Sequence, residues 1–212
     1  MRGDRGRELL SVPRLDLTPG GSLGISGPSG SGKSTFLFAV AGLLKAASGT
    51  VAWGDAAITA MGEARRAAFR AERIGIVFQD FLLFDELGAA DNAAIAALYA
   101  PRGARDGIRA RAGDLLSRLG LADEDRPVPG LSGGERQRVA VARAMAGNAD
   151  ILLADEPTAN LDRPTATRLV DDLLVRCRER GASLIAVSHD ETLLARLDRR
   201  IEIRDGKVRL DG

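Results

Sequence analysis

One stretch of the chain reads Gly27-Pro28-Ser29-Gly30-Ser31-Gly32-Lys33-Ser34-Thr35. It matches the pattern Gly-x4-Gly-Lys-Ser/Thr in full, a loop whose glycines let backbone N–H groups converge on phosphate oxygens. In such a loop Lys33 places a charge on the β- and γ-phosphates, and the Ser34 hydroxyl is the expected magnesium ligand. The loop follows an apolar run and opens a helical pattern, which is the context that the motif requires. We therefore predict a strand, a phosphate loop and a helix in this order.

Working outward from the loop, short apolar runs alternate with longer helical patterns. A helix is expected at 34–45, and strands are expected at 21–26, 50–53, 74–78, 151–154, 183–188, 201–204 and 207–210. Asp205-Gly206 between the last two runs predicts a β-hairpin. Buried strands that alternate with helices are typical of an α/β core with a mostly parallel sheet. We expect one domain over 1–212, with a helical subdomain at about 85–146 inserted into it.

The composition excludes several classes of protein. The chain has 212 residues with 30 Lys and Arg against 29 Asp and Glu, a balance that gives no overall field for nucleic acid or anionic lipid. The longest apolar stretches, 36–44 and 93–100, are too short to span a bilayer, and the first residues lack the apolar region of a secretory signal. The single cysteine, Cys177, has helical spacing with leucines. We interpret it as a core residue in a protein of the reducing cytosol.

Two carboxylates follow the apolar run at 151–154. Asp155 is expected to hold magnesium, directly or through water, and Glu156 to polarise an attacking water. An acidic pair that merely caps a strand is the alternative interpretation. The phosphate loop elsewhere in the chain favours the catalytic one.

Gln79 and His189 also follow predicted strands. The Gln79 amide can touch the metal shell and the segment after it, and a neutral His189 imidazole can accept from water and donate to a γ-phosphate oxygen. Each is also compatible with an ordinary polar strand end. Because parallel strands present their carboxyl ends to the ligand at one edge of the sheet, we expect both side chains at the nucleotide.

A second anion-binding element reads Leu131-Ser132-Gly133-Gly134-Glu135. If a helix starts at Glu135, its free N–H groups face outward beside the Ser132 hydroxyl, with no side chain on the glycines to shield them. One nucleotide has one set of phosphates. A second phosphate-binding element in the same chain therefore predicts another ligand.

These motifs, in this order, resemble the ATP-binding subunits of ABC transporters over nearly the whole chain. The resemblance implies the ABC type of P-loop fold, with a small antiparallel β part, and ATP hydrolysis with Mg²⁺. It identifies Gln79 as the glutamine loop, 131–135 as the signature and His189 as the switch histidine. The family's aspartate loop corresponds to Ala159-Asn160-Leu161-Asp162.

The same resemblance implies an answer for the second anion site. In this family two subunits pair head to tail, and the signature of one closes over ATP held by the other. Ser132, Gly133 and Gly134 would bind the partner's γ-phosphate, with Glu135 beside them, and Asp162 would bridge the interface. Closure would assemble the site and opening would reset it.

Finer features resemble the subgroup that serves lipoprotein-releasing and macrolide-exporting permeases, namely the stretches 73–81, 131–138 and 155–162. An exporter or extractor is therefore expected, with integral membrane permease partners, on the cytoplasmic face of the membrane. The apolar stretch 81–84 would help form the groove for a permease coupling helix. Core packing of the helical subdomain is the alternative for these residues, and an exposed apolar patch would mark a partner site.

One departure from the family pattern concerns adenine. The family begins with another strand and an aromatic residue that stacks on the base, but none of the 26 residues before Gly27 is aromatic or histidine. This favours a start that lies upstream, or else a base that is held less tightly. Loss of a stacking contact worth about 1 kcal/mol weakens binding about fivefold to tenfold.

Three competing functions remain. The first is a regulatory ATPase that acts through a membrane partner without transport, as in the related cell-division system. The second is an ABC ATPase acting on DNA or ribosomes, which the lack of coiled-coil insertions or tandem cassettes disfavours. The third is a subunit that binds nucleotide without hydrolysis.

Two groups of arginine side chains are expected to be exposed to solvent. The first is Arg65, Arg66, Arg70 and Arg73, and the second is Arg136, Arg138 and Arg143.

Overall fold

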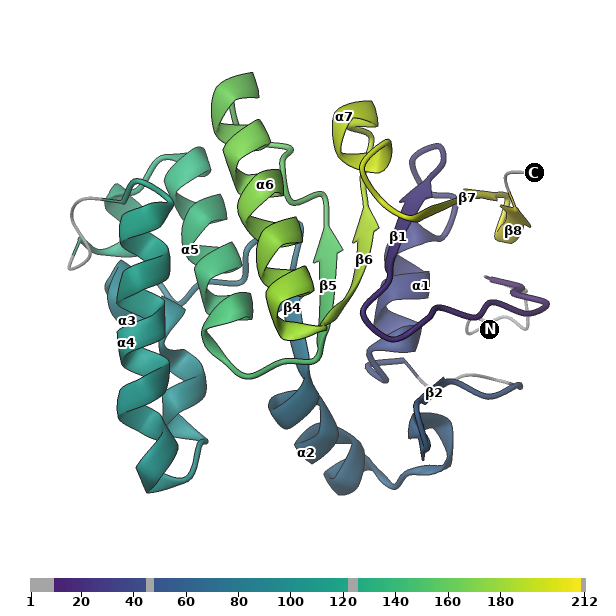
Figure 1. Ribbon diagram of the computed structural model, residues 1–212, viewed down its shortest axis with the longest axis horizontal. Helices are drawn as coiled ribbons and strands as arrows, with labels where there is room; N and C mark the ends of the chain where they lie inside the picture. Colours follow the sequence, from purple (N-terminus) through teal and green to yellow (C-terminus); the bar gives the residue numbers. More distant parts are fainter. Residues whose placement is uncertain (1–9, 45–47, 122–125, 211–212) are drawn as a thin grey trace.

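The computed structural model describes residues 10–44, 48–121 and 126–210. Its centre is a six-stranded sheet with the strand order β4-β5-β6-β1-β7-β8 (Figure 1). The strands are β1 (Ser22–Ser26), β4 (Ile74–Val77), β5 (Ile151–Asp155), β6 (Ser183–Val187), β7 (Arg199–Arg204) and β8 (Lys207–Leu210). All neighbouring pairs are parallel except β7 and β8, which form the hairpin expected around Asp205-Gly206. The prediction of a mostly parallel α/β fold is confirmed.

Helices flank this sheet. They are α1 (Lys33–Val40), α2 (Glu63–Arg73), α3 (Ala89–Ala93), α4 (Arg102–Arg118), α5 (Gly133–Ala146), α6 (Arg163–Arg180) and α7 (Glu191–Leu194). Short 3₁₀ turns lie at η1 (Ile58–Ala60), η2 (Ile95–Leu98) and η3 (Val128–Gly130). A second, two-stranded antiparallel sheet pairs β2 (Ala52–Trp53) with β3 (Ala56–Ala57). Helices α3, α4 and α5 lie together beyond the β4 edge of the sheet (Figure 1).

The central strands are buried on both faces, which explains why they read as continuous apolar runs. Along β5, Leu152 and Ala154 pack into a core with α5 and α6. The alternate residues Ile151 and Leu153 pack into a second core with α1. Side chains of a strand alternate between the two faces of the sheet, so each face needs its own helical cover. The sheet therefore holds the ends of its strands in fixed positions.

Several element boundaries differ from the sequence-based expectation. The helix after the phosphate loop ends at Val40 because Gly42 adopts a φ of +67° and its N–H bonds back to Ala39 O, which closes the helix. The expected end at Lys45 lies outside the described residues. Helix α5 begins at Gly133, two residues before Glu135, because the Ser132 side chain caps it.

The expectation that the arginines of α2 form a solvated face is wrong for two of them. The side chains of Arg66 and Arg70 are only 13% and 19% exposed, and both bond to Glu63. Arg70 also donates to Gly42 O at 2.9 Å. The bond from Arg70 to Gly42 O attaches α2 to the segment that follows α1.

Two further observations concern burial and length. Cys177 is a buried core residue, as expected, and burial raises the pKa of its thiol to about 11. Such a thiol carries little thiolate at neutral pH and is a poor nucleophile. Within the described ranges, every helix is too short or too polar to cross a membrane.

Candidate functional site

The phosphate loop leaves β1 and enters α1 through two glycines in unusual conformations. Gly27 has a φ of +140°, and a Cβ atom there would lie 2.1 Å from Ile203 O on β7. Gly32, with a φ of +107°, precedes α1 and puts no capping side chain over its first N–H groups. The Lys33 ammonium turns back into the loop and donates to Gly27 O at 2.7 Å and Pro28 O at 3.0 Å. The loop thus presents backbone donors and a buried cation.

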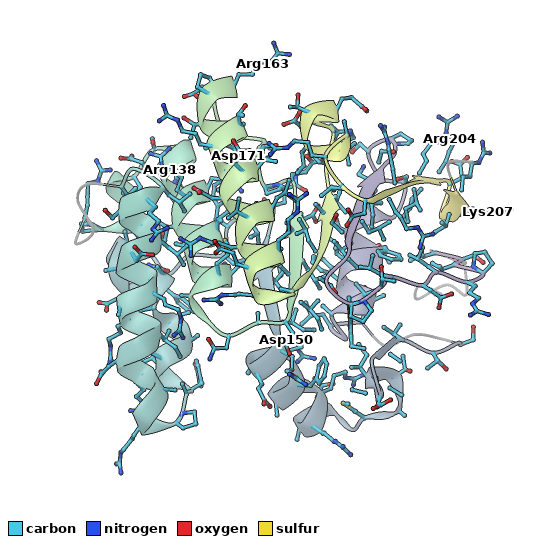
Figure 2. The ribbon with its side chains drawn as sticks, viewed as in Figure 1. Arg138, Asp150, Arg163, Asp171, Arg204 and Lys207 are labelled. Atoms are coloured by element: carbon cyan, nitrogen blue, oxygen red, sulfur yellow. The ribbon has the colours of Figure 1, made fainter. Side chains whose placement is uncertain are left out.

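A cavity of about 720 Å³ lies beside this loop, at the carboxyl ends of the parallel strands. Of the predicted site residues, it is lined by Ser29, Gly30, Gly32, Lys33, Ser34, Thr35, Gln79, Asp155, Glu156 and His189. In Figure 2, Arg163, which also lines the cavity, lies at the top of the view, and Asp150, which directly precedes β5, lies well below it, so β5 runs toward the cavity. The structure thus brings Gln79, Asp155, Glu156 and His189 together with the phosphate loop around one cavity.

The two carboxylates after β5 differ in their surroundings. Asp155 is 3% exposed, and burial raises the pKa of its carboxyl, while a hydrogen bond from Ser34 and the nearby Lys33 charge oppose that shift. Glu156 has a φ of +51°, which is uncommon for a residue with a side chain. Its N–H still bonds to Val187 O at 2.9 Å. The turn in the backbone at Glu156 redirects its carboxylate away from the strand.

That carboxylate faces the end of β6. Glu156 Oε2 accepts from the His189 backbone N–H at 3.2 Å, and Oε1 lies 3.4 Å from His189 Nε2. Ser188 Oγ lies 3.5 Å from Oε2. Burial raises the pKa of Glu156, and the His189 contacts lower it. Sequence reasoning missed Ser188, although its place directly before His189 at a strand exit was a usable signal.

The signature forms a capping box at the start of α5. Ser132 N–H donates to Glu135 Oε2 at 2.8 Å, and Glu135 N–H donates to Ser132 Oγ at 3.3 Å. The Arg126 guanidinium pairs with Glu135 Oε1. The bonds from Ser132, and then Arg126, lower the pKa of Glu135 to about 2. Its carboxylate is therefore engaged within its own chain.

The signature does not line the cavity of its own chain. Gly134 lies against the aspartate loop, where an added Cβ would be 3.3 Å from Asn160 O, and Ala159 and Leu161 of that loop line the cavity. Asp162 ends that loop and caps α6, accepting from Thr165 N–H at 2.8 Å, and this bond lowers the pKa of Asp162. Among the described residues, the structure thus separates the predicted site into a cavity group and a signature group.

Arg143 departs from the expected exposed cation. Its guanidinium donates to the backbone oxygens of Phe81 and Leu82, the segment directly after Gln79. Both residues have positive φ, +59° and +48°. Burial lowers the pKa of the Arg143 guanidinium. Arg136 and Arg138 are half-buried as well. Arg143 therefore links the helix that carries the signature to the segment after Gln79.

The fold and the groups at this cavity define a P-loop nucleoside triphosphatase. Residues 10–159 match the family model described as ABC transporter, and the chain belongs to that family. It is an ABC-type ATPase, the component that hydrolyses ATP to power a transporter.

Relatives in several bacteria cover almost the whole chain. The lipoprotein-releasing system ATP-binding protein LolD of Gluconobacter oxydans is 43% identical over 211 residues, 97% of this chain and 89% of that protein. LolD 1 of Caulobacter vibrioides is 40% identical, with 97% and 88% covered. The uncharacterized ABC transporter ATP-binding protein YbbA of Escherichia coli is 41% identical, with 98% and 91% covered.

Solved structures of ABC transporter cassettes have the same fold as this chain. The dimeric ABC transporter cassette MJ0796 superposes with a TM-score of 0.87 at 33% identity, covering 94% of this chain and 88% of that one. The same cassette in a post-hydrolysis state bound to ADP and phosphate gives the same values. The prediction of an ABC-type ATP-binding fold is confirmed.

Proposed function

We propose that the cavity binds ATP through residues 27–35 and hydrolyses it with Glu156 as the base. The Lys33 ammonium now bonds to two loop carbonyls, and the β- and γ-phosphates would replace these partners. Glu156 would accept the proton of the attacking water. His189 would hold that water and donate to the γ-phosphate, since its ring lies beside the Glu156 carboxylate.

The residues at the cavity fit a magnesium ion that arrives with ATP. No cluster of three or more His, Cys, Asp or Glu in the described ranges is suited to a metal. Mg²⁺ needs no such cluster, because it is bound by one or two protein ligands together with phosphates and water. The Ser34 hydroxyl bonds to the buried Asp155, and Gln79 lines the same cavity. These three oxygens would hold Mg²⁺, which would neutralise charge developing on the phosphates.

One observation supports a functional dimer: the signature lies outside the cavity of its own chain, although the cavity already contains the hydrolytic groups. We propose that Ser132, Gly133 and Gly134 bind the γ-phosphate of ATP held by a second copy. Asp162 would lie at the same interface, since its loop packs against Gly134. Glu135 would contribute through the capping box. The relative MJ0796 is described as dimeric.

A permease surface is proposed on the helical subdomain at 85–146 and the segment before it. Leu82 and Phe84 are 56% and 52% exposed, whereas Phe81 and Leu83 are partly buried and pack against the core. The alternate residues of 81–84 thus fit the two interpretations: Phe81 and Leu83 fit packing of the helical subdomain, and Leu82 and Phe84 fit a partner surface. The exposed pair would receive the permease on the cytoplasmic face of the membrane. Relatives named for lipoprotein release favour an extractor or exporter of lipid-linked substrates.

The test of this proposal is Ser132→Glu, with ATP binding measured on the isolated chain and phosphate release measured on the complex with its permease. The added carboxylate would repel the partner's γ-phosphate, so ATP should still bind the isolated chain while hydrolysis falls at least tenfold. The exposed Ser117→Glu on α4 is the matched control. Normal hydrolysis in Ser132→Glu would refute the shared site.

A further inference from the structure

The signature of this chain carries a negative charge where the proposed function places an anion. Glu135 stands one helical turn from Ser132 and bonds to its N–H at 2.8 Å. The partner's γ-phosphate would approach the same helix start. Like charges so close disfavour each other, and the effect grows as water is excluded by closure. An acidic capping box therefore needs a compensating charge.

Arg126 supplies a cation at this point. Its guanidinium pairs with Glu135 Oε1, while Oε2 takes the Ser132 N–H, so that both oxygens of the carboxylate are occupied. The pair is only partly solvated: the Arg126 side chain is 35% exposed and the Glu135 side chain 22%. Charges with this degree of cover are less screened by salt than fully exposed ones.

The backbone of Arg126 is itself fixed. Its carbonyl accepts from Ala89 N–H at 3.3 Å, at the start of α3. The next residue, Pro127, forms a bridge with Gly88. These contacts place the guanidinium against α5 from outside that helix.

We propose that Arg126 is a positioning residue for ATP hydrolysis, which neutralises Glu135 and so keeps the capped start of α5 receptive to the partner's γ-phosphate. The inference rests on the proposed function, because it assumes that Ser132 meets ATP from a second copy. The Arg126–Glu135 pair would thus do more than cap the helix. Glu135 orders the Ser132 backbone, and Arg126 removes the electrostatic cost of using an acid to do so.

The test is a double-variant cycle in the complex with its permease. Arg126→Ala leaves the Glu135 charge uncompensated, and the rate of hydrolysis should fall about tenfold while ATP binding by the isolated chain is unchanged. Glu135→Gln retains an oxygen for the Ser132 N–H and removes the charge, and its own rate of hydrolysis is the reference for the double variant. Combining the two should restore hydrolysis to within about twofold of Glu135→Gln, since no charge remains to be neutralised.

A second readout separates charge from structure. The defect of Arg126→Ala should shrink as salt is raised from about 0.05 to 0.5 M, because ions screen the repulsion. Arg126→Lys should retain most of the activity. The control is Arg118→Ala, which removes a more exposed ion pair with Asp114 on α4.

The outcomes are distinct. Wild-type hydrolysis in Arg126→Ala, or a double variant as impaired as Arg126→Ala alone, would overturn the inference, the latter by assigning Arg126 a structural role in its loop. If Ser132→Glu blocks hydrolysis in the same assay, the proposed function survives that result. If Ser132→Glu also hydrolyses ATP at the wild-type rate, the proposed shared site is refuted, and the inference about Arg126 is refuted with it.

Discussion

His189 Nε2 lies 3.4 Å from Oε1 of Glu156, and the His189 backbone N–H donates to the other carboxylate oxygen. The side chain of Glu156, which follows β5, thus contacts both the backbone and the ring of His189, which follows β6. Because Glu156 adopts a φ of +51°, its carboxylate is turned toward β6 rather than continuing along β5. The strand ends place a candidate base and its partner side by side.

This contact predicts the effect of His189→Ala. The carboxylate keeps its backbone donor but loses the ring that would orient water and γ-phosphate. We expect turnover to fall about 10²-fold, with ATP affinity changed less than threefold. Phosphate release and equilibrium nucleotide binding measure the two quantities. Unchanged turnover would assign the ring no part in the chemistry.

Arg143→Ala is predicted to loosen the segment after Gln79. Two backbone oxygens, of Phe81 and Leu82, lose their donor, so the free energy of unfolding should fall by about 1–3 kcal/mol. Hydrolysis should fall as well, since Gln79 lies two residues away. Urea unfolding and phosphate release test both expectations. Arg180→Ala, which removes a similar bond to Gly147 O, is the control and should leave hydrolysis intact.

Gly27→Ala is predicted to be incompatible with the phosphate loop. A Cβ atom there would meet Ile203 O at 2.1 Å, a clash with backbone that no side-chain motion relieves. We expect loss of nucleotide binding and destabilisation of at least about 3 kcal/mol. Gly49→Ala is the control: its φ of +85° is also positive, but its Cβ would enter open space, so about 1–2 kcal/mol is expected. Equal costs at both positions would contradict the steric account.

The capping box predicts a pH dependence of stability. The pKa of Glu135 is about 2 in the fold against an ordinary 4.5, so its carboxylate stabilises the fold above pH 4.5, and this contribution is lost as pH falls toward 2. The stability advantage of wild type over Glu135→Gln should therefore be constant above about pH 5 and shrink as pH falls from about 4.5 toward 2. Urea unfolding across this range measures it. The exposed Glu179→Gln should show a smaller change, and a pH-independent difference for Glu135→Gln would argue against the assigned bonds.

The phosphate loop and the carboxylates after β5 could be predicted from sequence because their spacing is local. The loop must sit between a strand and a helix, and both lie within a few residues of Lys33. The capping box is equally local: Ser132 and Glu135 match the Ser-x-x-Glu pattern, which also indicates a helix start at Gly133. That signal was present, although the expected start fell two residues later.

The roles of Arg143 and Arg126 could not be predicted in this way. Arg143 contacts oxygens 61 and 62 residues away in sequence. Arg126 reaches Glu135 only because the turn at η3 folds back on α5. Periodicity places such arginines on a helix or loop but carries no information on which backbone oxygens or carboxylates they meet. These contacts depend on tertiary packing, and at Arg143 they turned an expected exposed cation into a structural one.

The central claim is that this chain hydrolyses ATP with Glu156 as the base. The most direct measurement is phosphate release from Mg-ATP by wild type and by Glu156→Gln, with nucleotide binding measured on the same samples. The account predicts that Glu156→Gln binds ATP normally, releases phosphate at least about 10²-fold more slowly and accumulates as an ATP-bound dimer. Wild-type phosphate release from Glu156→Gln would contradict it.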